Sequence, residues 1–202
     1  MLEKESILHY SRQKFLAEGI ARVRMDDIAK DLRISKKTLY KYFPSKTDLI
    51  HDAIFDMIES AKKTFTEIIE GQGDAISKLE RIGKVFFGLA KNFSDKWLND
   101  IRIYHQPLWL EIDNFRSRVI EENFSKIIEQ GKKEGVFIDR PSPIILSVFL
   151  GAIRNVINPD FLMNNNFSFQ NAAQITLDML FTGLLTKQGR KAYKQIKSES
   201  MI

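Results

Sequence analysis

The stretch of sequence that decides the fold is residues 25–50, MDDIAKDLRISKKTLYKYFPSKTDLI. It is typical of two short amphipathic helices joined by a tight turn, followed by a proline and the start of a third helix. In the second helix Leu39 and Phe43 are four residues apart, so both side chains face the same small core. The spacing therefore predicts a helix-turn-helix whose second helix keeps a polar face free.

Capping signals mark both ends of that second helix. Ser35 can accept a hydrogen bond from the first free N–H groups, and Pro44 has no amide hydrogen with which to continue the helix. Ser45 and Asp48 resemble a capping box that opens the next helix. Lys46 then lies in the first turn of that helix, where free N–H groups attract phosphate.

The free face of the second helix carries cations, hydroxyls and phenols. Such a face suits the major groove of DNA, because its first residues can reach base edges while later ones contact phosphates. A solvated basic helix is the alternative, and the capping signals favour DNA binding over it. The predicted DNA-binding residues are Arg24, Ser35, Lys36, Lys37, Thr38, Tyr40, Lys41, Tyr42 and Lys46.

The positive charge of the chain is concentrated at the same end. Residues 1–46 contain eleven Lys and Arg against six Asp and Glu, and the rest contains twenty of each, so residues 1–46 carry the whole net charge of +5. Neutralisation of phosphates supplies most non-specific affinity for DNA. A second basic cluster, between Lys187 and Lys197, is interpreted as a solvated helix end.

The residues of this stretch also follow the pattern I-A, about six residues, then S-x-x-T-L-Y-x-Y-F-x-S-K-x-x-L. With it, residues 7–50 resemble the N-terminal domain of the tetracycline-repressor (TetR) family of bacterial transcription regulators. The resemblance implies a homodimer that binds a near-palindromic operator and has a divergent C-terminal domain that usually senses a small molecule. The residues that carry it are Ile28, Ala29, Ser35, Thr38, Leu39, Tyr40, Tyr42, Phe43, Ser45, Lys46 and Leu49.

Three positions depart from the family pattern. Arg33 stands where the family usually has glycine, so we expect a strained left-handed backbone in the turn. Arg24 replaces a threonine, which removes a capping hydroxyl from the first helix of the motif. Asp26 stands where relatives place a groove contact, and its charge should repel phosphate, so that contact is not carried over.

Length and composition indicate one small and one medium domain. The chain has 202 residues, of which 44% are hydrophobic, and no cysteine for a disulfide or thiolate metal site. Helical periodicity throughout predicts an all-α protein with a three-helix DNA-binding domain at 1–46 and a helical ligand-binding and dimerisation domain at 47–202. The start MLEKES lacks the apolar run of a signal peptide, and the apolar run at 144–153 is too short to span a membrane, so we expect a cytoplasmic protein.

The helix opened by Ser45 should run to the break at 71–73 and join the domains rigidly. A helix beginning near Asp95 should be interrupted by Pro107, with another from about Glu111 to Lys133. Residues 143–157 and 169–186 are apolar on more than one side. We interpret them as two helices that each subunit gives to a four-helix dimer interface; the alternative is the core of a single domain. The predicted interface residues are Val148, Gly151, Ala152, Ile175, Met179 and Gly183.

An aromatic stripe marks the middle of the chain, where Trp97, Ile101, Tyr104 and Leu108 follow a helical spacing. Such a stripe is more often core than binding site, but the family resemblance places ligand pockets among the helices of this region. We therefore predict a mainly apolar pocket for a small apolar or aromatic effector. Its predicted residues are Phe86, Trp97, Ile101, Tyr104, His105, Trp109, Phe115 and Asn155.

Enzyme and metal chemistry find no support in the sequence. The three histidines lack metal-ligand spacing, and no phosphate loop or nucleophile elbow is present, so we expect no catalytic activity, cofactor or metal site. The sequence predicts a ligand-responsive repressor that binds a palindromic operator as a homodimer. The alternative is a dimeric DNA-binding regulator whose C-terminal domain receives a protein partner and no small-molecule effector. An exposed apolar patch would favour the partner, and a closed cavity would favour the sensor.

Overall fold

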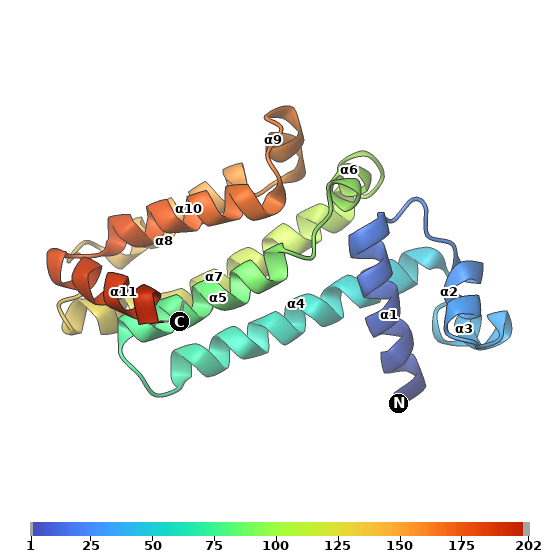
Figure 1. The fold of residues 1–202 in the computed structure, drawn as a ribbon, viewed down its shortest axis with the longest axis horizontal. Coiled ribbons are helices and arrows are strands. Elements are labelled where there is room, and N and C mark those ends of the chain that lie inside the picture. The colour runs from blue at the N-terminus through green and yellow to red at the C-terminus, as the bar shows by residue number, and fades with distance from the viewer. Residues whose placement is uncertain (1, 200–202) are drawn as a thin grey trace.

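A computed structural model describes residues 2–199 and shows an all-α protein, as the sequence predicts (Figure 1). Residue 1 and residues 200–202, which belong to the predicted domain ranges, lie outside the described part. Within that part no strand forms, and Phe137 and Leu185 make an isolated β-bridge. The helices are α1 Leu2–Glu18, α2 Met25–Asp31, α3 Lys36–Tyr42, α4 Lys46–Glu70, α5 Ala75–Ala90, α6 Asp95–Tyr104, α7 Gln106–Lys133, α8 Ser142–Val156, α9 Pro159–Asn164, α10 Phe169–Leu184 and α11 Lys187–Glu199.

Helices α1, α2 and α3 form a small domain at one end of the molecule, and α4 runs from it along most of the molecule's length (Figure 1). Phe15, Ile28, Leu39 and Phe43 are at most 1% exposed and belong to one hydrophobic cluster. Leu49 in the second turn of α4 joins the same cluster. The proposed domain boundary at residue 46 therefore falls at the start of a helix that both domains share.

The larger domain packs α5, α7, α8 and α10 with the remainder of α4. Side-chain caps fix where several of these helices begin, since Asp74, Ser94 and Ser168 each accept a hydrogen bond from the N–H group three residues later. Gly135 ends α7 with a φ of +70°, a conformation that suits glycine. As Figure 1 shows, α10 and α8 lie along one side of this bundle, away from α4.

Pro107 differs from the sequence-based expectation. It does not interrupt a helix but lies at the start of α7, which begins at Gln106, five residues before the predicted start. Proline is tolerated in a first turn, because the N–H group that it lacks would have no partner there. The break falls instead at His105, whose φ of −134° and ψ of 35° are not helical.

Membrane insertion has no helix to support it in residues 2–199. None of their helices combines the length and the apolar character that are needed to cross a bilayer.

Candidate DNA interface, effector cavity and dimer face

The second helix of the motif, α3, is held by the caps that the sequence predicts. Ser35 Oγ accepts a hydrogen bond from the backbone N–H of Thr38, and Ser45 Oγ accepts one from that of Asp48. Leu39 is buried, whereas Lys36, Lys37, Tyr40 and Lys41 are exposed. The polar face of α3 is therefore presented to solvent on a fixed support.

The cations of this face differ in how freely they could reach DNA. Lys36 Nζ lies 2.6 Å from Asp26 Oδ2, and this carboxylate raises the pKa of the lysine. No ion pair of Lys37 or Lys41 occurs among the described residues, and Lys41 lies 5.9 Å from the centre of the Tyr42 ring. Lys37 and Lys41 can therefore contact phosphate without first breaking an ion pair.

Other predicted DNA-binding residues also support the domain itself. The Tyr42 hydroxyl donates a hydrogen bond to Glu3 Oε2 at 3.0 Å, which raises the pKa of the phenol. Lys46 Nζ donates to the backbone oxygen of Ala21 at 3.5 Å, and burial lowers its pKa. Thr38 is half-buried beside Ser35, at 2.8 Å between the two hydroxyl oxygens.

Two of the three departures from the family pattern, at Arg33 and Arg24, behave as expected. Arg33 has a φ of +56°, so an arginine occupies the left-handed conformation that glycine takes at lower cost. Arg24 is exposed in the N-cap position of α2 and makes no side-chain capping bond. Its guanidinium is thus free of a local capping role.

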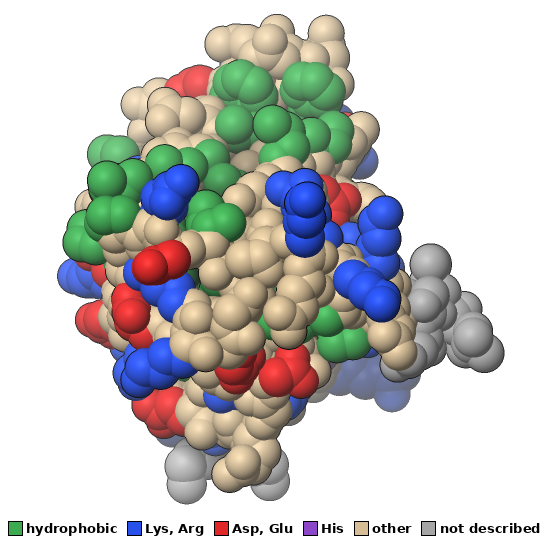
Figure 2. Space-filling view, turned by 90° about the vertical axis from the view of Figure 1, so that its left-hand side faces the viewer, with side chains coloured by type: hydrophobic (Ala, Val, Ile, Leu, Met, Phe, Trp, Pro, Cys, Tyr) green, Lys and Arg blue, Asp and Glu red, His purple; other side chains and the backbone are tan. Residues whose placement is uncertain are grey.

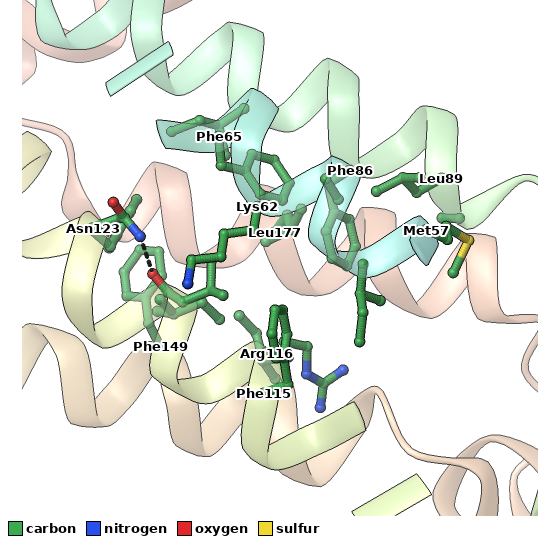
Figure 3. Close-up of a pocket in the computed structure, with 18 of the residues that line it drawn as sticks. Met57, Lys62, Phe65, Phe86, Leu89, Phe115, Arg116, Asn123, Phe149 and Leu177 are labelled. Carbon is green, nitrogen blue, oxygen red and sulfur yellow. Dashed lines mark hydrogen bonds between the residues drawn. The ribbon is translucent and has the colours of Figure 1, made fainter. Parts of the chain in front are cut away.

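The larger domain contains an apolar cavity of about 180 Å³ between α4, α5, α7, α8 and α10 (Figure 3). Eight phenylalanines line it, together with aliphatic side chains, Asn123, Lys62 and Arg116. The Asn123 side-chain amide donates to the backbone oxygen of Val119 at 2.9 Å, the bond drawn in Figure 3. An apolar cavity of this size is of the order of the ~150 Å³ that holds one benzene molecule.

The cavity does not lie where the sequence predicts it. Of the predicted ligand-binding residues, Phe86 and Phe115 line it, whereas Trp97, Ile101, Tyr104, His105, Trp109 and Asn155 do not. The reason is that α6 packs against α1, α7 and α9. Two residues of its apolar stripe, Trp97 and Ile101, are at most 1% exposed and are therefore buried in the core outside the cavity.

The remaining predicted residues occupy various positions around the cavity. Tyr104 is 64% exposed, and Asn155 is exposed and bonds to the backbone of its own helix at Gly151. His105 is half-buried at the start of α7, where burial lowers its pKa. The two tryptophans each contact a lining residue, since Trp97 packs on Phe93 and Trp109 lies under the guanidinium of Arg116.

Sequence reasoning missed the walls that α4, α8 and α10 provide. Met57, Ala61 and Phe65 follow the inward spacing of α4, and Phe149 and Phe181 come from the two late apolar helices. Their periodicity indicates that they face inward, but residues that fill the core and residues that line a cavity both face inward. Their pattern therefore could not separate the two.

A polar groove of about 740 Å³ lies on the other side of one cavity wall. Met57, Ala61, Leu89 and Phe93 line both spaces, so a single layer of side chains separates them. Residues of α1 form the far side of the groove. One layer of side chains thus separates the cavity from the groove, and the DNA-binding domain forms part of that groove's wall.

Two polar contacts tie the α5–α6 region to the small domain. Asp100 Oδ2 accepts a hydrogen bond from the backbone N–H of Ala21 at 2.8 Å, and the N–H of Ser94 donates to Leu16 at 3.2 Å. Asp100 is 8% exposed. These bonds hold the end of α1 and the turn after it against the larger domain.

An exposed apolar face covers α8 and α10. Ile144, Val148, Ile175 and Met179 are 48–70% exposed in the single chain. A Cβ atom placed at Gly151 or Gly183 would meet nothing within 4 Å, so the surface there is open. Figure 2 views the molecule from the end where α11 lies in Figure 1. It shows hydrophobic side chains gathered on the upper part of that end, with most of the charged side chains below them. The predicted interface residues thus lie on exposed or half-exposed surface, with Ala152 half-buried.

Metal chemistry is not favoured by the described residues, among which no group of three or more His, Cys, Asp or Glu side chains could hold an ion.

Comparison with known proteins agrees with this geometry. Residues 7–53 match the family model described as bacterial regulatory proteins, tetR family. The chain is 24% identical over 166 residues to the uncharacterized HTH-type transcriptional regulator YvaF of Bacillus subtilis, covering 79% of this chain and 84% of the relative. It is 27% identical over 143 residues to the nucleoid occlusion factor SlmA of Aliivibrio fischeri, covering 67% and 71%.

The fold is shared with solved regulators. A putative transcriptional regulator from Saccharomonospora viridis in complex with choline superposes with a TM-score of 0.64 at 19% identity, covering 92% of this chain and 98% of that one. The capped α3, the family match and the relatives define a helix-turn-helix, DNA-binding class of transcriptional regulator. Residues 7–53 are thus a DNA-binding domain of the tetR family of bacterial regulatory proteins, and the chain as a whole has the fold of the solved regulators.

Proposed function

We propose that the protein is a ligand-responsive repressor that binds a palindromic operator as a homodimer. The observation that carries the proposal is the apolar cavity of about 180 Å³ in the larger domain, one side chain away from the groove that α1 borders. A ligand in that cavity would press on Met57 and Leu89, which also face the groove. Its binding would therefore bias the position of α4 relative to α1.

The homodimer is supported by the exposed apolar face on α8 and α10. A single helix-turn-helix makes too few base contacts to be specific, and two of them read two half-sites about one DNA turn or a multiple apart. A ligand shifts operator affinity only through its differential binding to the two arrangements, commonly about 1–3 kcal/mol. Release from DNA then follows when the liganded arrangement changes the separation of the two α3 helices.

Selection of DNA sequences from a random pool, followed by mobility-shift titrations at several salt concentrations, tests the DNA-binding part. Lys37→Ala with Lys41→Ala should weaken binding to the selected operator and reduce the slope of log affinity against log salt by about 3.6, the value for two phosphate contacts in each subunit of the dimer. Lys187→Ala with Lys191→Ala removes the same charge from the exposed start of α11, far from α3 in Figure 1, and should have little effect. Equal effects of the two pairs would contradict the assignment of α3.

A second function is favoured by a separate observation. Ile103, Tyr104 and Leu110, around the α6–α7 junction, are exposed by 51–64%. Exposed apolar side chains are the kind of surface that would receive a protein partner instead of an effector. Two results together would support the protein-partner function. Ligands of the cavity would leave operator binding unchanged, and Leu110→Asp would alter regulation in cells.

A further inference from the structure

The ionisable side chains that line the cavity are all positively charged. Its ionisable lining residues are Lys62 and Arg116, and none of the described lining residues is a carboxylate. Asn123 is the other polar one. Burying an anion in such a space is costly unless a cation pairs with it, whereas a buried cation would find no partner.

The terminal nitrogens of Arg116 and the side-chain amide of Asn123 are committed to the protein itself, whereas Arg116 Nε is buried and has no hydrogen-bond partner among the described residues. One terminal nitrogen of Arg116 pairs with Asp113, and the other donates to the backbone oxygen of Ile157 at 3.3 Å. Asp113 also pairs with Arg154 at 3.1 Å, so one carboxylate serves two guanidinium groups. The side-chain amide of Asn123 is bonded within α7.

Lys62 retains hydrogen-bonding capacity. Its nearest carboxylate is that of Glu122, with Nζ and Oε2 3.9 Å apart, beyond hydrogen-bonding distance. The ammonium lies 5.7 Å from the centre of the Phe115 ring. Figure 3 shows the side chain reaching from α4 across toward α7, and it is 38% exposed. It therefore lies where the cavity meets solvent.

We propose that Lys62 binds the carboxylate of a hydrophobic acid whose apolar body fills the cavity. The inference rests on the effector role proposed above and names the chemistry of the effector. The size of the cavity suits a body of about six to eight carbon atoms, by comparison with the ~150 Å³ that one benzene fills. A cation of equal size would face both Lys62 and Arg116 without a buried counter-ion.

Three ligands with the same tail test the head group: octanoate, 1-octanol and octylammonium. Titration calorimetry on the intact protein should show octanoate binding most tightly. Lys62→Met keeps the length of the side chain and removes its charge, so it should weaken octanoate binding by about 10- to 100-fold and leave 1-octanol unchanged. Lys63→Met is the matched control, because the neighbouring Lys63 side chain is 81% exposed and does not line the cavity.

A variant that is expected to strengthen binding completes the test. Glu122→Gln removes the competing carboxylate and should strengthen octanoate binding. Equal binding of octanoate and 1-octanol, or loss of both in Lys62→Met, would overturn the role of Lys62 while leaving an effector cavity in place. Octanoate that binds through Lys62 without weakening operator binding would support the site and contradict the ligand-responsive function. Binding of none of the three ligands would overturn both.

Discussion

Replacing Met179 by aspartate perturbs the apolar face that we propose as the dimer interface. Met179 is 70% exposed in the single chain, and burying a whole methionine side chain contributes about 1.5–3 kcal/mol. Burial of the exposed part therefore contributes about 1–2 kcal/mol per copy. A two-fold interface counts this twice, giving about 2–4 kcal/mol.

The expected result is a dimer that dissociates at least about 30-fold more readily, since each 1.4 kcal/mol is a factor of ten. The aspartate adds a desolvation cost, which makes this a lower limit. Sedimentation equilibrium measures the dissociation constant, and far-ultraviolet circular dichroism checks that the variant remains helical. Leu110→Asp is the control, because Leu110 is 61% exposed but lies on α7, outside this face.

Two results would refute the reasoning. One is a monomeric unmutated protein at micromolar concentration. The other is equal dissociation of Leu110→Asp and Met179→Asp, because the face on α8 and α10 would then have no special role.

Two further predictions concern charge and packing. Asp26→Asn should raise affinity for any DNA and steepen the salt dependence by about 1.8 in slope, because it frees one lysine of α3 from its ion pair in each subunit of the dimer. Mobility shifts at several salt concentrations measure this, and an unchanged slope would contradict it. Gly88→Ala should stabilise the protein by about 0.5–1 kcal/mol, since its Cβ meets nothing within 4 Å inside α5. Gly131→Ala should destabilise it, because the new Cβ would lie 2.2 Å from a phenylalanine ring carbon; urea unfolding compares the two, and equal midpoints would contradict the packing argument.

The sequence by itself determined the DNA-binding end. Ser35, Leu39, Phe43 and Ser45 act through contacts between residues three or four positions apart, and such contacts can be read from spacing alone. The left-handed backbone at Arg33 was expected from the resemblance to the TetR family, which usually has glycine at that position. The all-α class follows from periodicity that persists along the whole chain.

Only the tertiary structure decided where the cavity lies. Trp97 and Phe86 have the same inward pattern in the sequence, yet Trp97 is buried against Phe93 outside the cavity, whereas Phe86 lines the cavity between α4, α5 and α7. Periodicity states that a side chain faces inward but not which helix it meets. Contacts of that kind join residues far apart in the chain.

The charge of the cavity was likewise hidden in the sequence. Lys62 and Lys63 are adjacent lysines on an amphipathic helix, and nothing in their spacing distinguishes them. The rotation of α4 turns Lys62 toward the cavity and leaves Lys63 in solvent. That rotation is set by the apolar side chains of α4 packing against α5 and α7, because burying them outweighs any preference of a single lysine.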